Sequence, residues 1–454
     1  MRSPARVTGQ GFTAALRRRV GAAELSSGLD VWLERALDEP LDWRYKGLSL
    51  LDGELTLRSL GERGLDAVAG DLSLPVLVLK ERALQHNVDA VARFCAEHGA
   101  SLAPHGKTYM SPQVFKRQLD AGAWGMTAAT ISHVRTYRAF GIERILMANE
   151  LVDAAGLRWL ARELDGDDRF SFYCLVDSQR GVALMDEALA SIAPRRALDV
   201  LVELGWPGTR AGARTDEQAL AVAQAVDRSR HLELAGVEGY EGVIGHDRDP
   251  DTLAAVDSFL DRVRAFVVEL DRRGAFDGRQ EVLVTAGGSA WFDRVVDRLA
   301  LGSTLSRPVR LVLRSGGYAT HDDGLYARAS PLRSGAVRDP LVPALEIWAE
   351  VLSRPEPTLA IAGFGKRDAP FDVDLPLPLR LVRRSGERLE LAGELTVLDL
   401  MDQHAFVRVD GVALEVGDRI GCGISHPCTA FDKWRLIPLV DDDYRVTGAI
   451  RTYF

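Results

Sequence analysis

The sequence predicts an α/β protein in which a parallel (β/α)8 barrel is followed by a mainly antiparallel β domain. From about residue 74, short apolar runs alternate with helical stretches, and this alternation implies parallel strands. After residue 330 the pattern changes to alternating apolar and polar residues between Gly and Pro turns, which is typical of antiparallel strands. The alternating region, residues 74–318, also has the length of a barrel of about 250 residues.

Nine apolar runs are candidates for strands in this region, enough for eight barrel strands and one extra strand in front. Each run ends in a small or polar residue, and the nine runs cover residues 74–79, 100–104, 125–130, 144–149, 172–177, 199–204, 234–240, 281–287 and 309–316. Helical stretches lie between them, most clearly at 216–233 and 251–274, where apolar residues recur at spacings of three and four. A doubly wound open sheet is the alternative that the same alternation allows.

The length of 454 residues exceeds that of one ordinary hydrophobic core, so more than one domain is expected. We predict a partly helical N-terminal extension over residues 1–72 that packs with the β domain. The barrel is predicted over 73–325, and the C-terminal β domain, which carries a metal site, over 326–454. The first 70 residues are the least informative part of the sequence.

Composition excludes several classes of function. The net charge of −9 argues against a nucleic-acid-binding protein, which would carry basic clusters. No apolar stretch approaches the roughly 20 residues that span a bilayer, and the first residues lack the apolar segment of a signal peptide. Four cysteines without a C-x-x-C pair do not form a disulfide framework, so we expect a reducing, cytoplasmic setting.

Lys107, in "APHGKTYM", follows what would be the first barrel strand. The functional residues of such barrels lie at the carboxyl ends of the strands, although a loop lysine can also be merely solvated. A lysine that is partly desolvated and near other cations, such as a protonated His105, would have a lowered pKa and could form a Schiff base. Gly106 would leave room for a flat cofactor, and Thr108 or His105 could donate a hydrogen bond near it.

Two glycine-rich turns near the last barrel strands, at residues 287–289 and 316–318, are candidates for binding a phosphate. Backbone N–H groups at such turns favour anions, and the loops after the last two strands of these barrels often bind phosphate. Both turns could also be ordinary loops. The polar or glycine residues that we expect to line this site, together with the side chains at other strand ends, are His105, Tyr240, Gly287, Gly288, Ser289, Gly316, Gly317 and Tyr318.

A third feature is the H-x-C motif of "GISHPCTAFDKW", in which His426 and Cys428 flank one proline. On an extended segment these side chains would point the same way and could reach one metal ion. Imidazole with thiolate suits zinc, and only two protein ligands would leave positions for water and substrate. The alternative is a loop histidine beside a buried cysteine.

Together these stretches resemble the pyridoxal-phosphate enzymes with an alanine-racemase-type barrel (fold type III). The resemblance is narrower to the D-serine dehydratase / D-threonine aldolase family and its bacterial "amino acid deaminase" branch. It rests on "APHGKTYMSPQVFKRQLDAGAWGMTAAT", "RILMANELVD", "DQHAFV" and "SHPCTAFDKW", and covers about residues 70–454. It implies that Lys107 binds pyridoxal phosphate covalently and that His426 and Cys428 bind zinc or another divalent metal. It also implies a homodimer with the site at the subunit interface.

The metal pair predicts the reaction. A β-hydroxyl is a poor leaving group, and a Lewis acid helps it to depart. In the resembling family dehydratases pair His with Cys, whereas D-threonine aldolases tend to pair His with Asp. We therefore expect β-elimination from D-serine or D-threonine to a 2-oxo acid and ammonia, with Lys107 as the catalytic residue.

Three alternatives stay open at this point. One is retro-aldol cleavage to glycine and an aldehyde, in which His404 could take the hydroxyl proton. Another is racemisation, which needs a second base such as Tyr240 or Tyr318. The third is a non-catalytic pyridoxal-phosphate-binding protein, although such proteins are single barrels without the β domain or the H-x-C motif.

Overall fold

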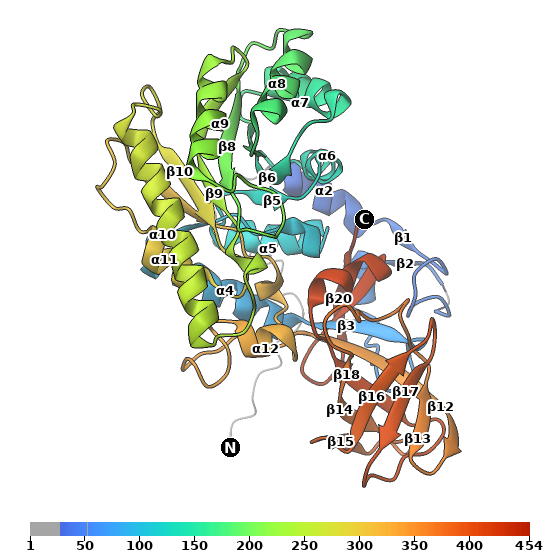
Figure 1. Ribbon diagram of the computed structural model, residues 1–454. Coiled ribbons are helices and arrows are strands. Elements are labelled where there is room, and N and C mark those ends of the chain that lie inside the picture. The colour runs from blue at the N-terminus through green and yellow to red at the C-terminus, as the bar shows by residue number, and fades with distance from the viewer. Residues whose placement is uncertain (1–27, 52) are drawn as a thin grey trace, which may run out of the picture.

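The computed structural model describes residues 28–51 and 53–454, in which a barrel with its helices lies beside a β domain (Figure 1). The barrel strands are β4 (Ser101–Leu102), β5 (Met126–Ala128), β6 (Arg144–Glu150), β7 (Ser171–Val176), β8 (Leu198–Leu204), β9 (Leu232–Gly239), β10 (Val282–Ala286) and β11 (Val309–Leu313). All their pairings are parallel, in the order β4-β11-β10-β9-β8-β7-β6-β5.

The strand ring closes, so the predicted barrel is confirmed and the doubly wound alternative is wrong. The two ends of the strand order are β4 and β5, and a parallel bridge between His105 and Thr127 joins them. Inside the ring lies a cluster of buried apolar side chains: Ala103, Leu175, Leu201, Ala235, Leu283 and Val312. The interior is therefore a packed core rather than a pore, as in other barrels of eight parallel strands.

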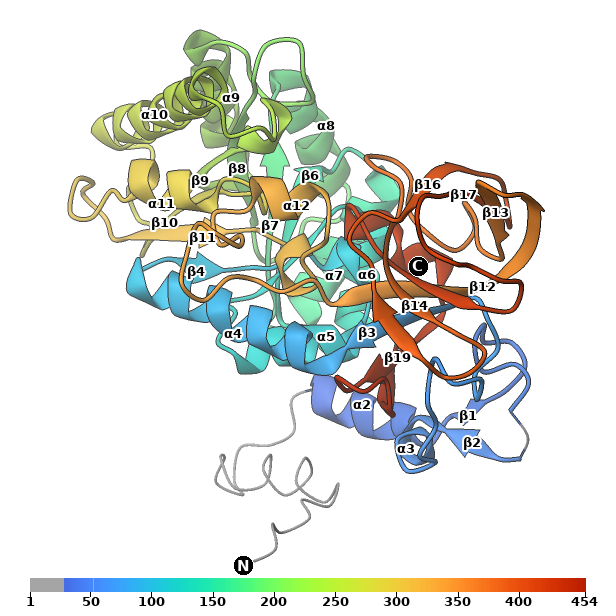
Figure 2. The same ribbon diagram turned by 90° about the horizontal axis from the view of Figure 1, so that it is seen from below.

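Helices cover the outside of the strand ring (Figure 2). They are α4 (Glu81–Glu97), α5 (Pro112–Asp120), α6 (Ile131–Ala139), α7 (Ala154–Gly166), α8 (Gln179–Ala190), α9 (Asp216–Arg228), α10 (Pro250–Arg272) and α11 (Phe292–Leu299), whereas the short α12 (Leu325–Ala329) follows the last barrel strand and contacts the segment before His426. The two helices that periodicity predicted most clearly are α9 and α10. Thr215 forms a capping box at the start of α9, and the Asp249 carboxylate caps α10, which satisfies amide groups that a helix start leaves free.

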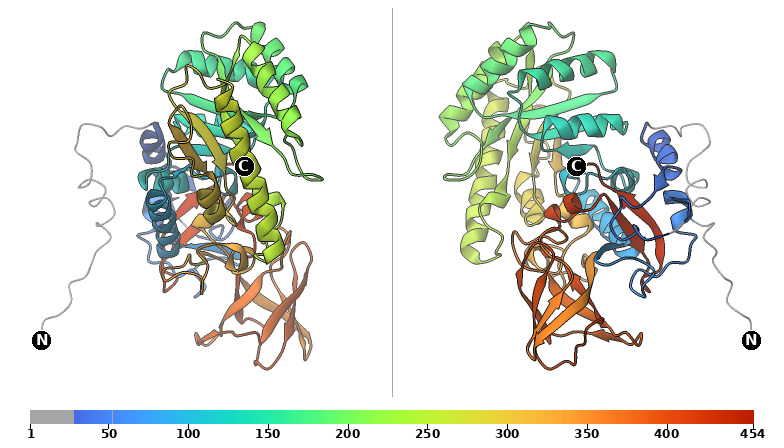
Figure 3. Two further views of the ribbon diagram at one scale, coloured as in Figure 1. Left: turned by 60° about the vertical axis from the view of Figure 1, so that its left-hand side comes forward. Right: turned by 90° about the vertical axis from the view of Figure 1, so that its right-hand side faces the viewer.

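The C-terminal domain is built from antiparallel strands, as predicted, and projects from one side of the barrel (Figure 3). Its central path runs β15-β14-β18-β12-β13-β17-β16. The strands are β12 (Leu345–Glu356), β13 (Leu359–Ala362), β14 (Leu377–Val382), β15 (Arg388–Glu390), β16 (Leu395–Leu400), β17 (Ala405–Val409), β18 (Arg419–Gly423), β19 (Leu436–Val440) and β20 (Val446–Arg451).

The extra strand in front of the barrel, β3 (Val76–Lys80), belongs to the sheet of the C-terminal domain. It pairs antiparallel with β12 and parallel with β19, and its residues Val76 to Leu79 are fully buried. The chain therefore passes from this sheet into the barrel and later returns. The boundaries that we predict at residues 72 and 325 remain a prediction, because β3 lies in sequence with the barrel and in space with the β domain.

The N-terminal segment consists of α2 (Gly28–Leu37), β1 (Pro40–Leu41), β2 (Leu55–Thr56) and α3 (Leu57–Leu60). Part of the predicted extension, residues 1–27, lies outside the described residues. Apolar side chains of the described segment, including Leu55 and Leu60, share one buried cluster with Trp348 and Tyr444 of the C-terminal sheet. The backbone amide of Ala67 also donates to the carbonyl of Tyr444 at 2.9 Å. No helix in the described ranges is both long and apolar enough to cross a membrane.

Glu346 on β12 is a buried carboxylate on which β3, β12 and β14 converge. It forms ion pairs with Lys80 of β3 and Arg380 of β14. It also accepts hydrogen bonds from the hydroxyl of Tyr444 at 2.7 Å and from the indole N–H of Trp348 at 3.1 Å. A buried charge is tolerated only when it is paired and hydrogen-bonded, and these four donors meet that requirement.

Replacing Glu346 by Ala should destabilise the protein strongly, because Lys80 would lose its carboxylate partner and Arg380 would lose its buried one. Breaking such a buried pair from one side costs about 3 to 5 kcal/mol. The matched control is Glu390→Ala, since Glu390 also pairs with Arg380, at 3.0 Å, but its side chain is 76% exposed. That change should cost less than about 1 kcal/mol. Urea unfolding followed by circular dichroism measures both, and equal midpoints for the two variants would contradict this account.

Candidate functional site

Lys107 lies in a short 3-10 helix, Gly106–Thr108, at the carboxyl end of β4. The loop is tight because Gly106 is packed from behind: a Cβ on Gly106 would come within 2.5 Å of the hydroxyl of Tyr137 and within 2.6 Å of the ring of Phe115. The predicted reason for this glycine, room for a cofactor, is therefore wrong. Gly106 lets the lysine loop lie directly against the aromatic side chains of α5 and α6.

The ε-amino group of Lys107 is half-buried and makes no ion pair with any described residue. Burial lowers its pKa below the usual 10.5, and the charges of Arg210 and Arg314 lower it further, although the Cys428 thiolate acts in the opposite direction. A larger fraction of the amine is therefore neutral and nucleophilic than for an exposed lysine. This environment fits a lysine that binds an aldehyde cofactor.

His105 does not supply the positive charge that we expected beside Lys107. Burial holds its pKa well below the usual value, and the charges of Lys107 and Arg314 add to the effect, so the imidazole is neutral. Its Nδ1 is buried without a hydrogen-bond partner in the described chain, which leaves one polar atom near Lys107 free for a ligand. The cations near the amine are Arg210 and Arg314 instead.

The H-x-C motif reaches the lysine from the C-terminal domain. The Cys428 thiol lies 3.4 Å from the hydroxyl of Thr108, the residue next to Lys107. The side chains of His426 and Cys428 lie close enough for their charges to interact. Burial alone would lower the pKa of His426, but the Cys428 thiolate and the Asp372 carboxylate outweigh it and raise the pKa to about 9.

Imidazole and thiolate thus converge beside the lysine, and their donor chemistry suits zinc. No group of three or more His, Cys, Asp or Glu side chains within residues 28–51 and 53–454 is arranged to hold a metal ion. A metal at this place would therefore have two protein ligands. Such an open arrangement leaves positions for water and substrate, as expected of a catalytic rather than a structural site.

The glycine turns that we predicted to bind phosphate are partly occupied by the protein itself. The buried Glu241 carboxylate accepts the amide of Gly287 at 3.0 Å and that of Gly288 at 2.8 Å. These two amides already have an anionic partner, so we narrow the phosphate prediction to Ser289 and the turn at Gly316 and Gly317. Ser289 lies close to the hydroxyl of Tyr326, a residue of α12.

Gly316 and Tyr240 both lie near the lysine loop. A Cβ on Gly316 would come within 2.7 Å of the carbonyl of His105 and within 3.2 Å of the Thr108 hydroxyl oxygen, so this turn lies against the lysine loop. The ring of Tyr240 lies under the guanidinium of Arg210 at 4.5 Å. Burial raises the pKa of Tyr240 to about 12, so its hydroxyl is protonated at neutral pH.

The predicted role of the Tyr318 side chain is wrong, because its hydroxyl is engaged away from the lysine. The amide of Gln118, on α5, donates to it at 3.1 Å, and burial raises its pKa. His404 is also far from the expected place. It is exposed at the β16–β17 turn, which contacts the loop at Gly365–Arg367 of the same domain. Within the described chain neither side chain can act as a base at Lys107.

Several residues of the site were missed in the sequence. His133, the third residue of α6, lies near enough for the charge of Lys107 to lower its pKa, in addition to a larger effect of burial. His246 follows β9, and its pKa is lowered by burial and then by the charge on His426. Asp372 accepts from Nδ1 of His426 at 2.6 Å, across 54 residues of sequence. Position in strand-end loops could have indicated the two histidines, whereas nothing in the sequence indicated Asp372.

Two buried carboxyl groups in the barrel complete the electrostatics. Glu238 of β9 pairs with Arg314 at the end of β11, and both are shielded from water. Burial raises the pKa of Glu203 of β8 to about 11, and the neighbouring Glu238 and Glu150 add to it. Glu203 is therefore uncharged at neutral pH and does not neutralise the nearby charge of Arg210.

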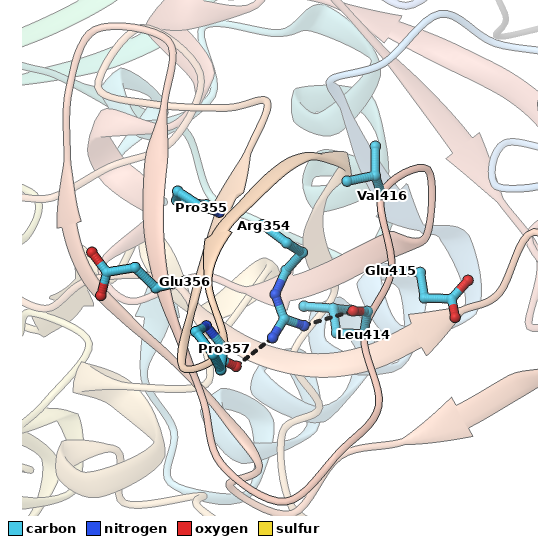
Figure 4. A pocket seen from close by; sticks show the side chains of 7 residues that line it. All are labelled: Arg354, Pro355, Glu356, Pro357, Leu414, Glu415 and Val416. Atoms are coloured by element: carbon cyan, nitrogen blue, oxygen red, sulfur yellow. Dashed lines mark hydrogen bonds between the residues drawn. The ribbon is translucent and has the colours of Figure 1, made fainter.

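A shallow hollow of about 460 Å³ at the β12–β13 hairpin is unrelated to this site (Figure 4). The side chain of Arg354 crosses it and donates to the carbonyls of Leu414 and Pro357. A larger groove, of about 1010 Å³, is lined by residues from Tyr173 to Glu281 on the helices and strand starts of the barrel. It too contains none of the residues around Lys107.

Comparison with known proteins agrees with the fold. The "Alanine racemase, N-terminal domain" family model matches residues 79–302, and the "Putative serine dehydratase domain" model matches residues 344–440. The chain is therefore similar to the D-serine dehydratase / D-threonine aldolase family. Its members are pyridoxal-phosphate-dependent lyases with an alanine-racemase-type fold.

Individual relatives of this family resemble the chain over most of its length. D-threonine aldolase from an Arthrobacter species is 27% identical over 74% of this chain and 80% of that protein. The crystal structure of D-threonine aldolase from Filomicrobium marinum matches with a TM-score of 0.69 and 24% identity, over 86% of this chain and 97% of that chain. A D-threo-3-hydroxyaspartate dehydratase, solved as a cysteine-to-alanine mutant in the metal-free form, gives a TM-score of 0.67 at 20% identity, over 84% and 98%.

The lowered pKa of Lys107 predicts its reactivity in the cofactor-free protein. Only the neutral amine attacks an amine-selective reagent, so Lys107 should be modified at a lower pH than an ordinary lysine. Lys116 is the internal comparison, because its half-buried amine is held in ion pairs with Asp30 and Asp120. Peptide mass spectrometry of protein labelled between about pH 7 and 10 should show Lys107 reacting first. Equal pH profiles for the two lysines would contradict the prediction.

Proposed function

We propose that this chain is a metal-assisted dehydratase of D-β-hydroxy amino acids, such as D-serine or D-threonine, and forms a 2-oxo acid and ammonia. The observation that carries the proposal is the place of Cys428. A thiol, rather than a carboxylate, accompanies His426 and lies against Thr108 next to Lys107. In the resembling family this His–Cys pair accompanies dehydration.

The relatives support the substrate class. D-threonine and D-threo-3-hydroxyaspartate, named for the aldolases and the dehydratase that resemble this chain, are both amino acids with a β-hydroxyl group. The dehydratase solved in the metal-free form is a cysteine-to-alanine mutant, which supports a metal-binding role for a cysteine in such proteins. For this chain, D-serine and D-threonine are the substrates that we propose.

Pyridoxal phosphate, when bound, would make the Cα–H bond of an amino acid acidic by delocalising the electron pair that the proton leaves behind. Lys107 would hold the cofactor, and its neutral ε-amino group would later accept the α-proton. Arg210 lies over Tyr240, which provides a flat, cationic surface beside this amine. The Ser289 hydroxyl and the turn at Gly316 are the candidates for holding the phosphate.

His426 and Cys428 would hold a divalent metal, which would supply a Lewis acid for the departure of the β-hydroxyl. The metal would occupy the edge of the pocket where the C-terminal domain meets the barrel, because Cys428 contacts the lysine loop there. Zinc is the metal that the donor set favours. We also propose a homodimer, on the resemblance alone.

Retro-aldol cleavage is the second candidate, and the position of His246 favours it. Retro-aldol chemistry needs a base for the hydroxyl proton, and His404, our expected base, lies on an exposed turn of the β domain. Burial lowers the pKa of His246, and its imidazole lies close enough to His426 for the charge on His426 to lower that pKa further. At neutral pH His246 is therefore uncharged. It could therefore accept a proton near the metal pair.

The remaining two alternatives are not supported. Racemisation would need a second base, but the Tyr318 hydroxyl is engaged by Gln118, and burial raises the pKa of Tyr240 to about 12, so that its hydroxyl is protonated at neutral pH. A non-catalytic single-barrel protein would lack the β domain and the H-x-C motif, both of which this chain contains. The choice therefore lies between two lyase reactions.

Product analysis with D-threonine decides between them. A dehydratase forms 2-oxobutyrate and ammonia, whereas an aldolase forms glycine and acetaldehyde. We expect 2-oxobutyrate as the main product from the enzyme loaded with pyridoxal phosphate and zinc. If glycine accumulates in its place, the dehydratase proposal is wrong and the aldolase is the function. His246→Gln then tests the base, because it should reduce cleavage but not elimination.

Metal removal should abolish turnover of D-serine without loss of the cofactor. Cys428→Ala or chelation is expected to lower the rate by several orders of magnitude, since each missing ~1.4 kcal/mol of transition-state stabilisation costs tenfold and a metal supplies several. The visible absorbance of the bound cofactor should stay intact. β-Chloro-D-alanine, which carries a better leaving group, should depend far less on the metal. Unchanged D-serine turnover after both treatments would make this H-x-C motif structural.

A further inference from the structure

His426 is held by carboxylates at two places, its ring and its backbone. Nδ1 of the ring lies 2.6 Å from Oδ2 of Asp372, and the other oxygen of that carboxylate accepts the hydroxyl of Thr429 at 2.9 Å. A carboxylate only accepts hydrogen bonds, so the proton of this contact belongs to Nδ1. The lone pair of a neutral His426 ring is therefore on Nε2.

The backbone of His426 is fixed independently of its ring. Its φ of 60° lies in the left-handed region, which residues other than glycine adopt only occasionally, histidine more often than most. The amide of His426 donates to Asp322 at 3.0 Å, and the same carboxylate accepts the amides of Gly324 and Tyr326 at the start of α12. Such strain persists only where the surroundings enforce it, and it is common at functional sites.

Asp372 lies in the long loop between β13 and β14, where apolar and acidic residues alternate. Phe371 and Val373 are each 46% exposed, while the carboxylates of Asp372 and Asp374 contact the segment that carries the H-x-C motif. Asp374 has a different task, because it accepts the hydroxyl of Ser425 at 2.7 Å and pairs with Arg328 at 2.9 Å. Asp374 therefore holds the segment before the motif in place, whereas Asp372 holds the imidazole of His426.

We propose that Asp372 is a positioning residue that orients His426, keeps Nε2 free to bind a metal with Cys428, and so sets the metal affinity of the site. The inference rests on the proposed metal-assisted function. A carboxylate that accepts from the second nitrogen of a metal-binding histidine fixes its tautomer and ring orientation and increases its basicity. Loss of such a partner typically costs about 10- to 100-fold in metal affinity.

The test measures metal binding rather than turnover. Full-length protein freed of metal is titrated with Zn²⁺ against a chromophoric chelator, and with Co²⁺, whose spectrum reports thiolate coordination. Asp372→Ala should bind both ions about 10- to 100-fold more weakly, while the Co²⁺–thiolate charge-transfer band remains. Asp372→Asn retains an oxygen that accepts from Nδ1 and should lose less. Asp374→Ala is the matched control from the same loop and should stay near wild-type affinity.

A second measurement distinguishes orientation from a general structural effect. In the Co²⁺ protein, the Nδ1 proton of a coordinated imidazole gives a shifted, exchangeable proton NMR signal. This proton should exchange slowly in the wild type and in Asp374→Ala, and much faster in Asp372→Ala, because the carboxylate that protects it is gone. Thr429→Val removes only the second donor to Asp372 and should leave the signal unchanged.

Each outcome bears on the inference. Wild-type metal affinity and slow exchange in Asp372→Ala would overturn it, and so would an equal loss of affinity in Asp374→Ala, which would indicate a disturbed loop. If the unmodified protein binds neither Zn²⁺ nor Co²⁺ through Cys428, the proposed metal-assisted function fails as well. The two failures are distinguishable, because the second is seen in the wild type without any substitution at Asp372.

Discussion

The contact between Thr108 and Cys428 is the interaction on which the site depends. The lysine loop belongs to the barrel and the H-x-C motif to the C-terminal domain, and these two residues lie 320 positions apart in the chain. The proposed function needs both halves, because Lys107 would supply the amine and the H-x-C motif the metal that helps a hydroxyl to leave. The packing of the two domains therefore determines whether the chemistry is possible.

The strand β3 connects the two domains and fixes their relative position. It enters the C-terminal sheet between β12 and β19, and the chain then continues directly into α4 of the barrel. Glu346 on β12 binds Lys80, the last residue of β3, together with Arg380 and Tyr444. A buried, fully paired carboxylate of this kind restricts the register of its neighbours, because any shift would leave charges unpaired. The start of the barrel is thus fixed to the domain that carries the H-x-C motif.

The electrostatics of the pocket follow from burial rather than from the histidine beside the lysine. His105 is kept neutral, and Arg210 and Arg314 provide the positive charge that lowers the pKa of Lys107. Arg314 is balanced by Glu238, whereas Glu203 carries a proton at neutral pH. Arg210 is therefore the cation beside Lys107 that suits an anionic cofactor or the carboxylate of an amino acid.

Much of the architecture was determined by the sequence alone. The eight barrel strands, the extra strand in front, the helices α9 and α10 and the antiparallel character of the C-terminal domain all follow from hydrophobic periodicity, which is a local property of the chain. The candidates Lys107, His426 and Cys428 were also indicated by short motifs. Local patterns predict such features because they depend on residues only a few positions apart.

Only the tertiary structure decided what surrounds these residues. It placed β3 in the distant sheet, engaged the amides of Gly287 and Gly288 with Glu241, turned the Tyr318 hydroxyl to Gln118, and left His404 on an exposed turn. It also brought Asp372 to His426 and Arg210 to Tyr240. The physical reason is that hydrogen bonds, burial and pKa shifts depend on distances in space, and in this protein the decisive partners come from segments tens to hundreds of residues apart.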